Sequence, residues 1–249
     1  MTVATIPELI IPDREWSMVR GRVNAHWDAR ECPHHTIMGQ TRSGKSYLIR
    51  HGILPLCHYD RVLILDAKGN DPTLTGLGRP VDRIPNKGMR GIRQMVRDKK
   101  PRDNWYRLMI VRGYDAGHDQ VGEALERVYN EGDWIVVVDE LRHLVDSRYP
   151  GIGLRNEWEE LMLRGGSRGV AMINASQEPK WLPSSYYTQG SFYWISRIED
   201  ESVQKRIAEI GSSRALMPHL QAIPKRRWIA MDNLEDERFW SKTVVKKGQ

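Results

Sequence analysis

A glycine-rich segment carries the clearest chemical signal in this sequence of 249 residues. Gly39 and Gly44, separated by four residues, are followed directly by Lys45 and Ser46. Glycines let the backbone curl so that successive N–H groups point at phosphate oxygens, and a helix that follows adds the positive end of its dipole. The segment therefore predicts a phosphate-binding loop. Its expected ATP-binding residues are Gly39, Gln40, Thr41, Arg42, Ser43, Gly44, Lys45, Ser46 and Tyr47.

The last residues of this loop suit a triphosphate with Mg²⁺ as cofactors. We expect Lys45 to neutralise the β and γ phosphates and the Ser46 hydroxyl to bind Mg²⁺. A glycine-rich turn with an incidental lysine is the alternative. The run Thr36-Ile37-Met38 before the loop and the helical phase of 47–49 after it favour phosphate binding, because the motif requires a strand before it and a helix after it.

Two neighbouring acids follow the longest apolar run of the chain. This run covers 134–138, and Asp139 and Glu140 come directly after it. Asp139 would hold Mg²⁺ through its water shell, and Glu140 would polarise the water that attacks the γ-phosphate. The alternative is a helix cap. A base beside a metal ligand suits hydrolysis by water better than transfer to a bound hydroxyl, so the pair favours an ATPase over a small-molecule kinase.

A parallel sheet is needed to bring these segments together. Short apolar runs alternate with helical patterns from His35 onward, which is typical of parallel strands joined by crossover helices. We expect strands over 35–38, 61–65, 105–111, 134–138, 170–175, 192–195 and 228–231. We expect helices over 44–53, 89–97, 153–163 and 201–210, and another marked by Val121, Ala124, Leu125 and Val128. The predicted fold class is α/β, with a mostly parallel central sheet flanked by helices.

Composition is consistent with a soluble globular protein. Apolar residues make up 40% and charged residues 28% of the chain. The longest apolar run is far shorter than a membrane span, so we expect a cytoplasmic protein without one. Cys32 and Cys57 are the only cysteines and do not predict a disulfide framework. Cys32 with His34 and His35 lacks the second ligand pair of a structural metal site.

The chain divides into three predicted regions. Residues 1–30 mix prolines and charges without clean periodicity, and we expect an N-terminal arm or irregular cap there. Residues 31–235 carry all the motifs and should form one ATPase domain. Residues 236–249 are expected to be a basic C-terminal tail.

From about Pro33 to the last expected strand, the chain resembles the FtsK/HerA superfamily of ring-forming, DNA-pumping ATPases. The matching segments are Pro33–Gly39, Leu63–Gly69, the pair Asp139-Glu140, Leu163–Val170 and Ala175-Ser176-Gln177. The chain departs from the family pattern at Ala67, which replaces a proline, and at Glu178, where members often carry a basic or amide residue. The resemblance implies a RecA-like P-loop NTPase of the ASCE type.

The resemblance also implies catalytic roles beyond the phosphate loop. Gln177 is similar to a sensor glutamine that contacts the γ-phosphate or the water. Arg168 matches best the arginine finger that a neighbouring subunit inserts, with Arg164 in reserve. Such a guanidinium stabilises charge on the transferred phosphoryl group. The alternative is that both arginines cover a solvated helix end.

Further expectations concern partners. The resemblance implies a homo-oligomeric ring, a hexamer or a pentamer, that moves double-stranded DNA. The chain is most like compact single-domain members, including genome-packaging ATPases of double-stranded DNA viruses with internal membranes. A viral member would work in the host cytoplasm and at a virion vertex, with a portal or vertex protein as its docking partner.

Basic residues supply candidates for the DNA contact. The net charge is +6 and the pI about 9.3, which agrees with a polyanionic partner without requiring one. The expected helix 89–97 has a basic stripe, which a solvated outer face would also explain. The candidates are Arg90, Arg93, Arg97, Lys99, Lys100, Arg142 and Arg148.

Two other functions compete with a DNA translocase. A P-loop kinase of a small metabolite would use Arg42 and Arg164 as phosphate clamps. A HerA-like DNA-processing or secretion ATPase would use the same ring on a different substrate. DNA binding across a salt titration separates a DNA motor from a polypeptide motor, because only phosphate neutralisation gives a steep counterion-release slope.

Overall fold

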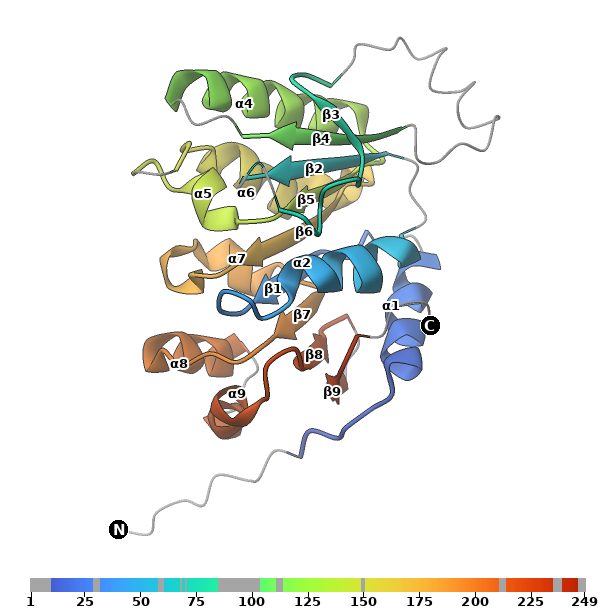
Figure 1. Ribbon diagram of the computed structural model, residues 1–249, viewed down its shortest axis with the longest axis vertical. Helices are drawn as coiled ribbons and strands as arrows, with labels where there is room; N and C mark the ends of the chain where they lie inside the picture. Colours follow the sequence, from blue (N-terminus) through green and yellow to red (C-terminus); the bar gives the residue numbers. More distant parts are fainter. Residues whose placement is uncertain are drawn as a thin grey trace.

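The computed structural model describes residues 10–28, 32–57, 61–67, 69, 71–84, 104–110, 114–148, 151–210, 214–234 and 239–245. The expected basic helix 89–97 lies outside these residues. Figure 1 shows helices on both faces of a central sheet.

Nine strands within the described residues form one sheet in the order β3-β4-β2-β5-β6-β1-β7-β8-β9. They are β1 (His35–Met38), β2 (Val62–Asp66), β3 (Arg79–Val81), β4 (Trp105–Met109), β5 (Ile135–Val138), β6 (Ala171–Ser176), β7 (Phe192–Ile195), β8 (Trp228–Asp232) and β9 (Phe239–Thr243). All neighbours from β3 to β7 pair in parallel, whereas β8 and β9 are antiparallel additions. The mostly parallel α/β sheet expected from the sequence is confirmed.

Two groups of helices cover the sheet. One face carries α4 (Tyr114–Glu131), α5 (Leu141–Val145), α6 (Arg155–Arg164), α7 (Ser184–Thr188), α8 (Glu201–Ile210) and α9 (Met217–Ala222). The other carries α1 (Trp16–Asp28), the short α2 (Lys45–Tyr47), the π-helix η1 (Leu48–Ile53) and the 3₁₀ turn η2 (Leu54–Leu56). Further 3₁₀ turns are η4 (Gly165–Arg168), η5 (Pro179–Trp181) and η6 (Arg214–Leu216).

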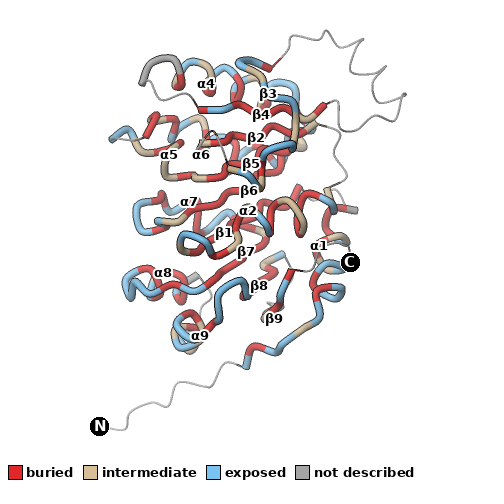
Figure 2. The backbone as a smooth tube through the Cα atoms, viewed as in Figure 1, coloured by how far each residue is buried: buried red, intermediate tan, exposed pale blue. Residues whose placement is uncertain are grey.

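The strand before the acidic pair, β5, has only apolar residues because it is buried on both faces of the sheet. Val136 and Val138 belong to the core under α4 and α6, whereas Ile135 and Val137 belong to the core under α1 and η1. Successive strand side chains point to opposite faces, so a strand between two helical layers needs no polar position. Figure 2 shows this buried centre and the exposed outer turns of the helices.

A helix replaces the irregular segment expected near the N-terminus. Trp16, Val19, Val23 and Trp27 form a narrow apolar stripe on α1, and all four are buried in the core beneath it. So thin a stripe between polar residues is a weak sequence signal, and packing against the sheet supplies most of the stability of such a helix. The helix lies beside β8 and β9 in Figure 1.

A strand also occupies part of the expected basic tail. β9 pairs antiparallel with β8, and Lys242 exchanges backbone hydrogen bonds with the N-terminal segment, from its N–H to Pro12 and to its carbonyl from Arg14. The residues before α1 and strand β9 are therefore joined at this edge. This pairing links segments more than two hundred residues apart, so local sequence carries little sign of it.

His34 and His35 are neutral core residues. Nδ1 of His34 accepts the Met172 N–H at 3.1 Å, and Nδ1 of His35 accepts the Trp194 indole N–H at 3.0 Å. Burial lowers the pKa of His34 to about 4 and that of His35 to about 3. A protonated Nδ1 could not accept these bonds, so the structure holds both imidazoles uncharged. Among the described residues, no group of three or more His, Cys, Asp or Glu side chains is arranged to hold a metal ion.

Acid should destabilise the fold through this histidine pair. Both folded-state pKa values lie below the ordinary 6.5, so the unfolded chain binds more protons as pH falls. Their stabilising contribution is complete above about pH 6.5 and is lost toward pH 4 and below. Urea titrations from pH 8 to pH 5 should show the free energy of unfolding falling by on the order of 1 kcal/mol per pH unit for each histidine below about pH 6.

The matched control is His35→Phe, which keeps a ring between the aromatic neighbours of His35 and removes one titrating group. Its free energy of unfolding should depend less steeply on pH than that of the wild type. An equal slope in the two proteins would contradict the assignment.

Candidate functional site: a phosphate loop facing two strand-end acids

Strand register brings the separate motifs to one edge of the sheet. Met38 pairs with Ser176, and Leu65 pairs with Val138. Because these strands are parallel, their carboxyl ends lie together, and ligands of open α/β sheets bind at that edge. The phosphate loop, Asp139-Glu140 and Gln177 all begin where these strands stop.

The loop itself needs glycine at two positions. Gly44 has φ of 95°, in the left-handed region, at the start of α2. A Cβ on Gly39 would lie 2.8 Å from Ser43 Oγ and 2.9 Å from Ser196 Cβ, too close for any side chain. The Lys45 ammonium donates to the carbonyls of Gly39 at 2.7 Å and Gln40 at 3.0 Å, which holds its buried side chain along the loop.

Ser46 and Asp139 meet at the start of α2. The Ser46 hydroxyl lies 3.5 Å from Asp139 Oδ1, and Asp139 is fully buried. A hydroxyl and a carboxylate are the hard oxygen donors that Mg²⁺ prefers, usually with several of its waters retained. These residues therefore fit the ion expected from the sequence. The same hydroxyl donates to Asp71 Oδ2 at 2.8 Å, a contact that no motif indicated.

Glu140 is held by the end of the neighbouring strand. Its Oε1 accepts the Ser176 hydroxyl at 2.8 Å, and the Gln177 N–H donates to both carboxylate oxygens at 3.2 and 3.3 Å. Burial raises the pKa of the Glu140 carboxyl, while the Ser176 hydroxyl, the Lys45 ammonium and the Gln177 amide oppose the rise. A carboxylate that is oriented and more basic than usual suits a general base.

Gln177 contacts the phosphate loop directly. The Thr41 hydroxyl donates to Gln177 Oε1 at 2.6 Å, which joins the exposed top of the loop to the end of β6. Arg42 and Tyr47 are exposed on the same segment, and the Tyr47 ring contacts His51 at 4.5 Å between centroids. Hydrogen bonds thus join the loop to Gln177 and Gln177 to Glu140.

Arg164 and Arg168 lie at the other edge of the sheet. Both precede the amino end of β6, whose six residues span roughly 20 Å. Arg168 donates to the carbonyls of Tyr129 at 3.2 Å and Asn130 at 3.1 Å, and Arg164 is 3.4 Å from Glu160. Neither guanidinium reaches the phosphate loop of its own chain, although both are exposed.

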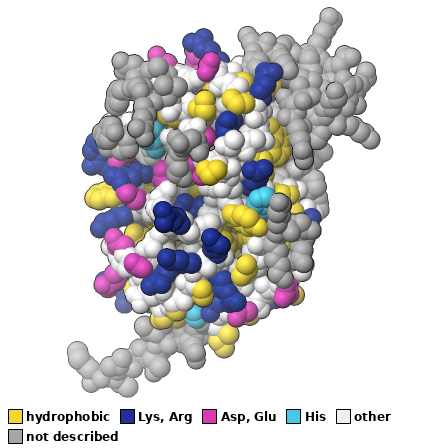
Figure 3. Space-filling view, viewed as in Figure 1, with side chains coloured by type: hydrophobic (Ala, Val, Ile, Leu, Met, Phe, Trp, Pro, Cys, Tyr) yellow, Lys and Arg dark blue, Asp and Glu magenta, His cyan; other side chains and the backbone are white. Residues whose placement is uncertain are grey.

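The two described DNA-contact candidates are already paired with acids. Arg142 forms an ion pair with Glu178 and lies 3.7 Å from Asp146, and Arg148 lies 3.0 Å from Asp146. The Arg142 guanidinium also lies over Trp181, which is 52% exposed. Figure 3 shows basic and acidic side chains interspersed over the face viewed. The remaining candidates, Arg90, Arg93, Arg97, Lys99 and Lys100, lie outside the described residues.

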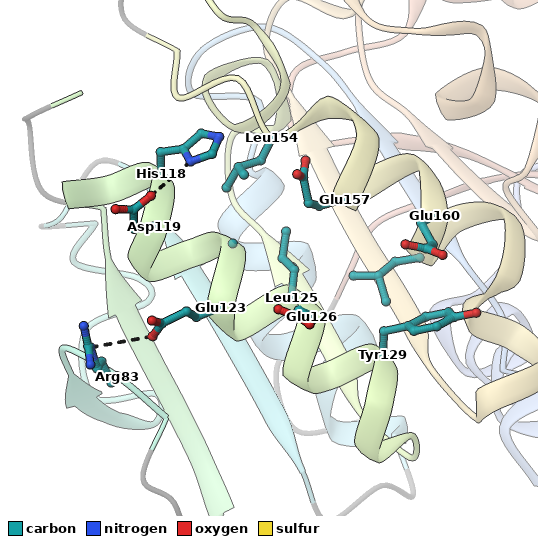
Figure 4. A pocket seen from close by; sticks show the side chains of 12 residues that line it. Arg83, His118, Asp119, Glu123, Leu125, Glu126, Tyr129, Leu154, Glu157 and Glu160 are labelled. Carbon is teal, nitrogen blue, oxygen red and sulfur yellow. Dashed lines mark hydrogen bonds and ion pairs between the residues drawn. The ribbon is translucent and has the colours of Figure 1, made fainter. Parts of the chain in front are cut away.

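One hollow lies away from the nucleotide site. It has a volume of about 600 Å³ between α4 and α6, and Figure 4 shows carboxylates from both helices around it. These acids are Asp119, Glu123, Glu126, Glu157 and Glu160. They outnumber Arg83 and His118 on the same lining, so the groove disfavours a phosphate or a nucleic acid. A smaller hollow of about 230 Å³ lies beside Glu140 and Gln177.

Solved structures share this arrangement of strands and helices. The genome packaging NTPase B204 of Sulfolobus turreted icosahedral virus 2, in complex with AMPPCP, is 15% identical with a TM-score of 0.61, over 86% of this chain and 100% of that one. VirB4 of Thermoanaerobacter pseudethanolicus is 11% identical with a TM-score of 0.59, over 86% and 90%. The chain has the fold of these proteins.

The Type VII secretion ATPase EccC of Thermomonospora curvata is also similar. It is 20% identical with a TM-score of 0.50, over 87% of this chain and 26% of the EccC cytoplasmic domain.

No family model matches the chain, and no curated protein matches its sequence. No helix among the described residues is long and apolar enough to cross a membrane. The fold implied by the sequence resemblance is thus confirmed.

Two site residues were missed by sequence reasoning. Ser176 belongs to a segment that matches the family pattern, but the sequence assigned a role only to its neighbour Gln177. Its position beside Gln177 at a strand end was the signal that could have identified it. Asp71 follows the loop after β2, and its contact with Ser46 joins positions 25 residues apart. Only the tertiary structure brings that carboxylate to the phosphate loop.

Removing the Ser176 hydroxyl should slow hydrolysis without weakening nucleotide binding. Ser176→Ala removes one of the bonds that orient Glu140, and we expect kcat to fall by roughly 10-fold or more, since one charge-assisted hydrogen bond contributes about 1.5–3 kcal/mol. KM for ATP should stay within about twofold. Steady-state ATPase kinetics measure both quantities.

Ser176→Thr is the matched control, because it keeps a hydroxyl at this position and should retain most of the activity. An equal loss in the alanine and threonine variants would indicate that packing, not the bond to Glu140, is responsible.

Proposed function

We propose that the chain is an ATPase that hydrolyses ATP with Mg²⁺ as its cofactor. The observation that carries the proposal is the convergence of a phosphate loop with Ser46, Asp139 and Glu140 at one sheet edge. B204, which has the same fold, is described in complex with AMPPCP, and this supports nucleotide binding here. Glu140, the proposed base, closely follows the end of β5, and from there it would reach a water beside a γ-phosphate.

Each group has a distinct role in this proposal. Backbone N–H groups of the loop and the Lys45 ammonium bind and orient the phosphate chain. Ser46 and Asp139 would hold Mg²⁺, which supplies charge neutralisation on the phosphates when bound. Glu140 accepts a proton from the attacking water, while Ser176 keeps its carboxylate in place.

We propose further that hydrolysis drives the movement of double-stranded DNA through a homo-oligomeric ring, as in viral genome packaging. The fold shared with B204, a genome packaging NTPase, and the net charge of +6 support this substrate. A packaging motor would be a pentamer or hexamer docked on a portal or vertex protein, in the host cytoplasm and at the virion vertex.

The position of the two arginines supports an oligomeric active site. Arg164 and Arg168 are exposed at the sheet edge opposite the phosphate loop, so each could serve only the site of a neighbouring protomer. Arg168, our first choice for the finger, is presented by η4 and steadied by bonds to the Tyr129 and Asn130 carbonyls. A finger supplied in this way would make hydrolysis depend on assembly.

A secretion ATPase is the second candidate, because EccC shares the fold at 20% identity. That function would use the same nucleotide chemistry on a polypeptide substrate. The ion pairs of Arg142 and Arg148 with neighbouring acids weaken the case for DNA contact at those two positions. The two functions differ in salt dependence, since binding that neutralises phosphates weakens steeply with added salt.

Double-stranded DNA should stimulate ATP hydrolysis, and Glu140→Gln should abolish it. The amide keeps the size of the carboxylate but cannot accept the proton of water, so turnover should fall by at least about 100-fold. Binding of a fluorescent ATP analogue should remain within a few fold of wild type. Phosphate release with and without a DNA duplex, at 50 to 300 mM salt, measures both effects.

The result also separates the two substrates. Stimulation by DNA that fades steeply with salt supports a DNA motor, whereas hydrolysis indifferent to DNA at every salt concentration would favour polypeptide transport. Unchanged turnover in Glu140→Gln would remove Glu140 as the base.

Mixing two inactive variants should restore activity if Arg168 acts across a subunit boundary. Arg168→Ala keeps its own Glu140 but lacks the finger, and Glu140→Gln keeps the finger but lacks the base. Alone, the arginine variant should lose roughly 10³-fold or more in kcat. Mixed rings contain boundaries with both groups intact, so phosphate release by the mixture should exceed the sum of the separate variants.

Arg164→Ala is the parallel variant, since Arg164 is also exposed on this edge. We expect a smaller loss of kcat there. Failure of the mixture to recover, with both variants melting normally and assembling as the wild type does, would rule out a finger supplied by Arg168.

A further inference from the structure

We propose that Asp71 is a positioning residue for the Mg²⁺ site. Its carboxylate holds the Ser46 hydroxyl in place by accepting a hydrogen bond from it. This inference rests on the nucleotide site of the proposed function but does not depend on the transported substrate. It assigns a role to a carboxylate outside the phosphate loop and outside the strand-end acid pair. The contact that carries it is the 2.8 Å bond from Ser46 Oγ to Asp71 Oδ2.

The Ser46 hydroxyl could donate its hydrogen bond to either of two carboxylates, and the shorter distance identifies the acceptor. Asp71 Oδ2 is at 2.8 Å and Asp139 Oδ1 at 3.5 Å. A serine hydroxyl has one proton and two lone pairs, so donation to Asp71 directs a lone pair of the oxygen elsewhere. Asp139 then does not accept the Ser46 hydrogen bond, and its carboxylate would remain available to Mg²⁺. Groups behind a metal ligand commonly fix its orientation in this way.

The turn that presents Asp71 is held from several sides. Asp71 Oδ1 accepts the Thr73 N–H at 2.8 Å, so one carboxylate oxygen caps the turn while the other faces Ser46. Arg50, on η1, donates to the carbonyls of Thr73 at 2.5 Å and Thr75 at 3.2 Å. Leu74 is fully buried in the core beneath η1. The Asp71 carboxylate is thus fixed against α2 and η1, the helical segments at the end of the phosphate loop.

The experiment measures how much Mg²⁺ the protein needs to bind a fluorescent, non-hydrolysable ATP analogue in the absence of DNA. Asp71→Asn keeps the side-chain volume, and its carbonyl can still accept the Thr73 N–H. Its NH₂ group would then face Ser46, and this group cannot accept the hydroxyl proton. The Mg²⁺ concentration for half-maximal binding should rise roughly 10- to 100-fold, as for other groups behind metal ligands.

A double-mutant cycle separates this role from a general effect of the turn. Ser46→Ala removes the hydroxyl on which Asp71 acts, so Asp71→Asn should cause no further change in the Mg²⁺ requirement in that background. Arg50→Gln loosens the same turn without altering the carboxylate. We expect it to lower the melting temperature and to change the Mg²⁺ requirement much less than Asp71→Asn does.

Three outcomes would overturn the inference. The first is an unchanged or lower Mg²⁺ requirement in Asp71→Asn, and the second is an equal rise in the Ser46→Ala background. Either would leave the ATPase proposal intact, because the wild-type protein still binds the analogue with Mg²⁺. The third is a wild-type protein that binds no analogue at any Mg²⁺ concentration, which would end both the role of Asp71 and the proposed function.

Discussion

Parallel pairing of β1 with its two neighbours is the constraint on which the site depends. The pairing of Met38 with Ser176 fixes where the chain leaves β1 relative to where it leaves β6, so the phosphate loop and Gln177 emerge side by side. A shift of one residue would turn every side chain of the strand to the opposite face, and both faces are occupied by helices. The hydrophobic cores therefore fix the register, and the register places the chemistry.

Local bonds then convert this placement into defined orientations. Glu140 is bound by Ser176 and the Gln177 amide, Lys45 by the loop carbonyls, and Ser46 by the turn at Asp71. Glu140 and Ser46 are thus held by partners on other elements, and Lys45 by carbonyls of its own loop. Groups that are oriented before reaction need little reorganisation during it, which is a main source of catalytic power in enzymes.

The acidic groove and the two exposed arginines lie on a different part of the molecule from the phosphate loop. The carboxylates between α4 and α6 form an acidic groove, while Arg164 and Arg168 project from the adjoining end of α6 and from η4. The phosphate loop opens at the opposite edge of the sheet. Under the proposed function, a chain with its candidate finger and its phosphate loop at opposite edges would contact its neighbour head to tail, the kind of contact that closes into rings.

The sequence by itself determined the parts of the protein that depend on local pattern. The loop with Lys45 and Ser46, the acidic pair after an apolar run, and the strands β1, β5, β6 and β7 could be predicted because a motif or a fully apolar run marks each of them. Their residue types follow from burial on both faces or from phosphate chemistry. These signals need no knowledge of distant segments.

Only the tertiary structure decided the contacts between segments far apart in the chain. The helix α1 has a narrow apolar stripe, and β9 is an edge strand beside the N-terminal segment, so neither has a strong local signal. Asp71 reaches Ser46 because Leu74 and Arg50 hold its turn against η1. Arg168 is separated from its own phosphate loop by the length of β6. In each case packing sets the distance between residues, and a linear pattern does not contain that distance.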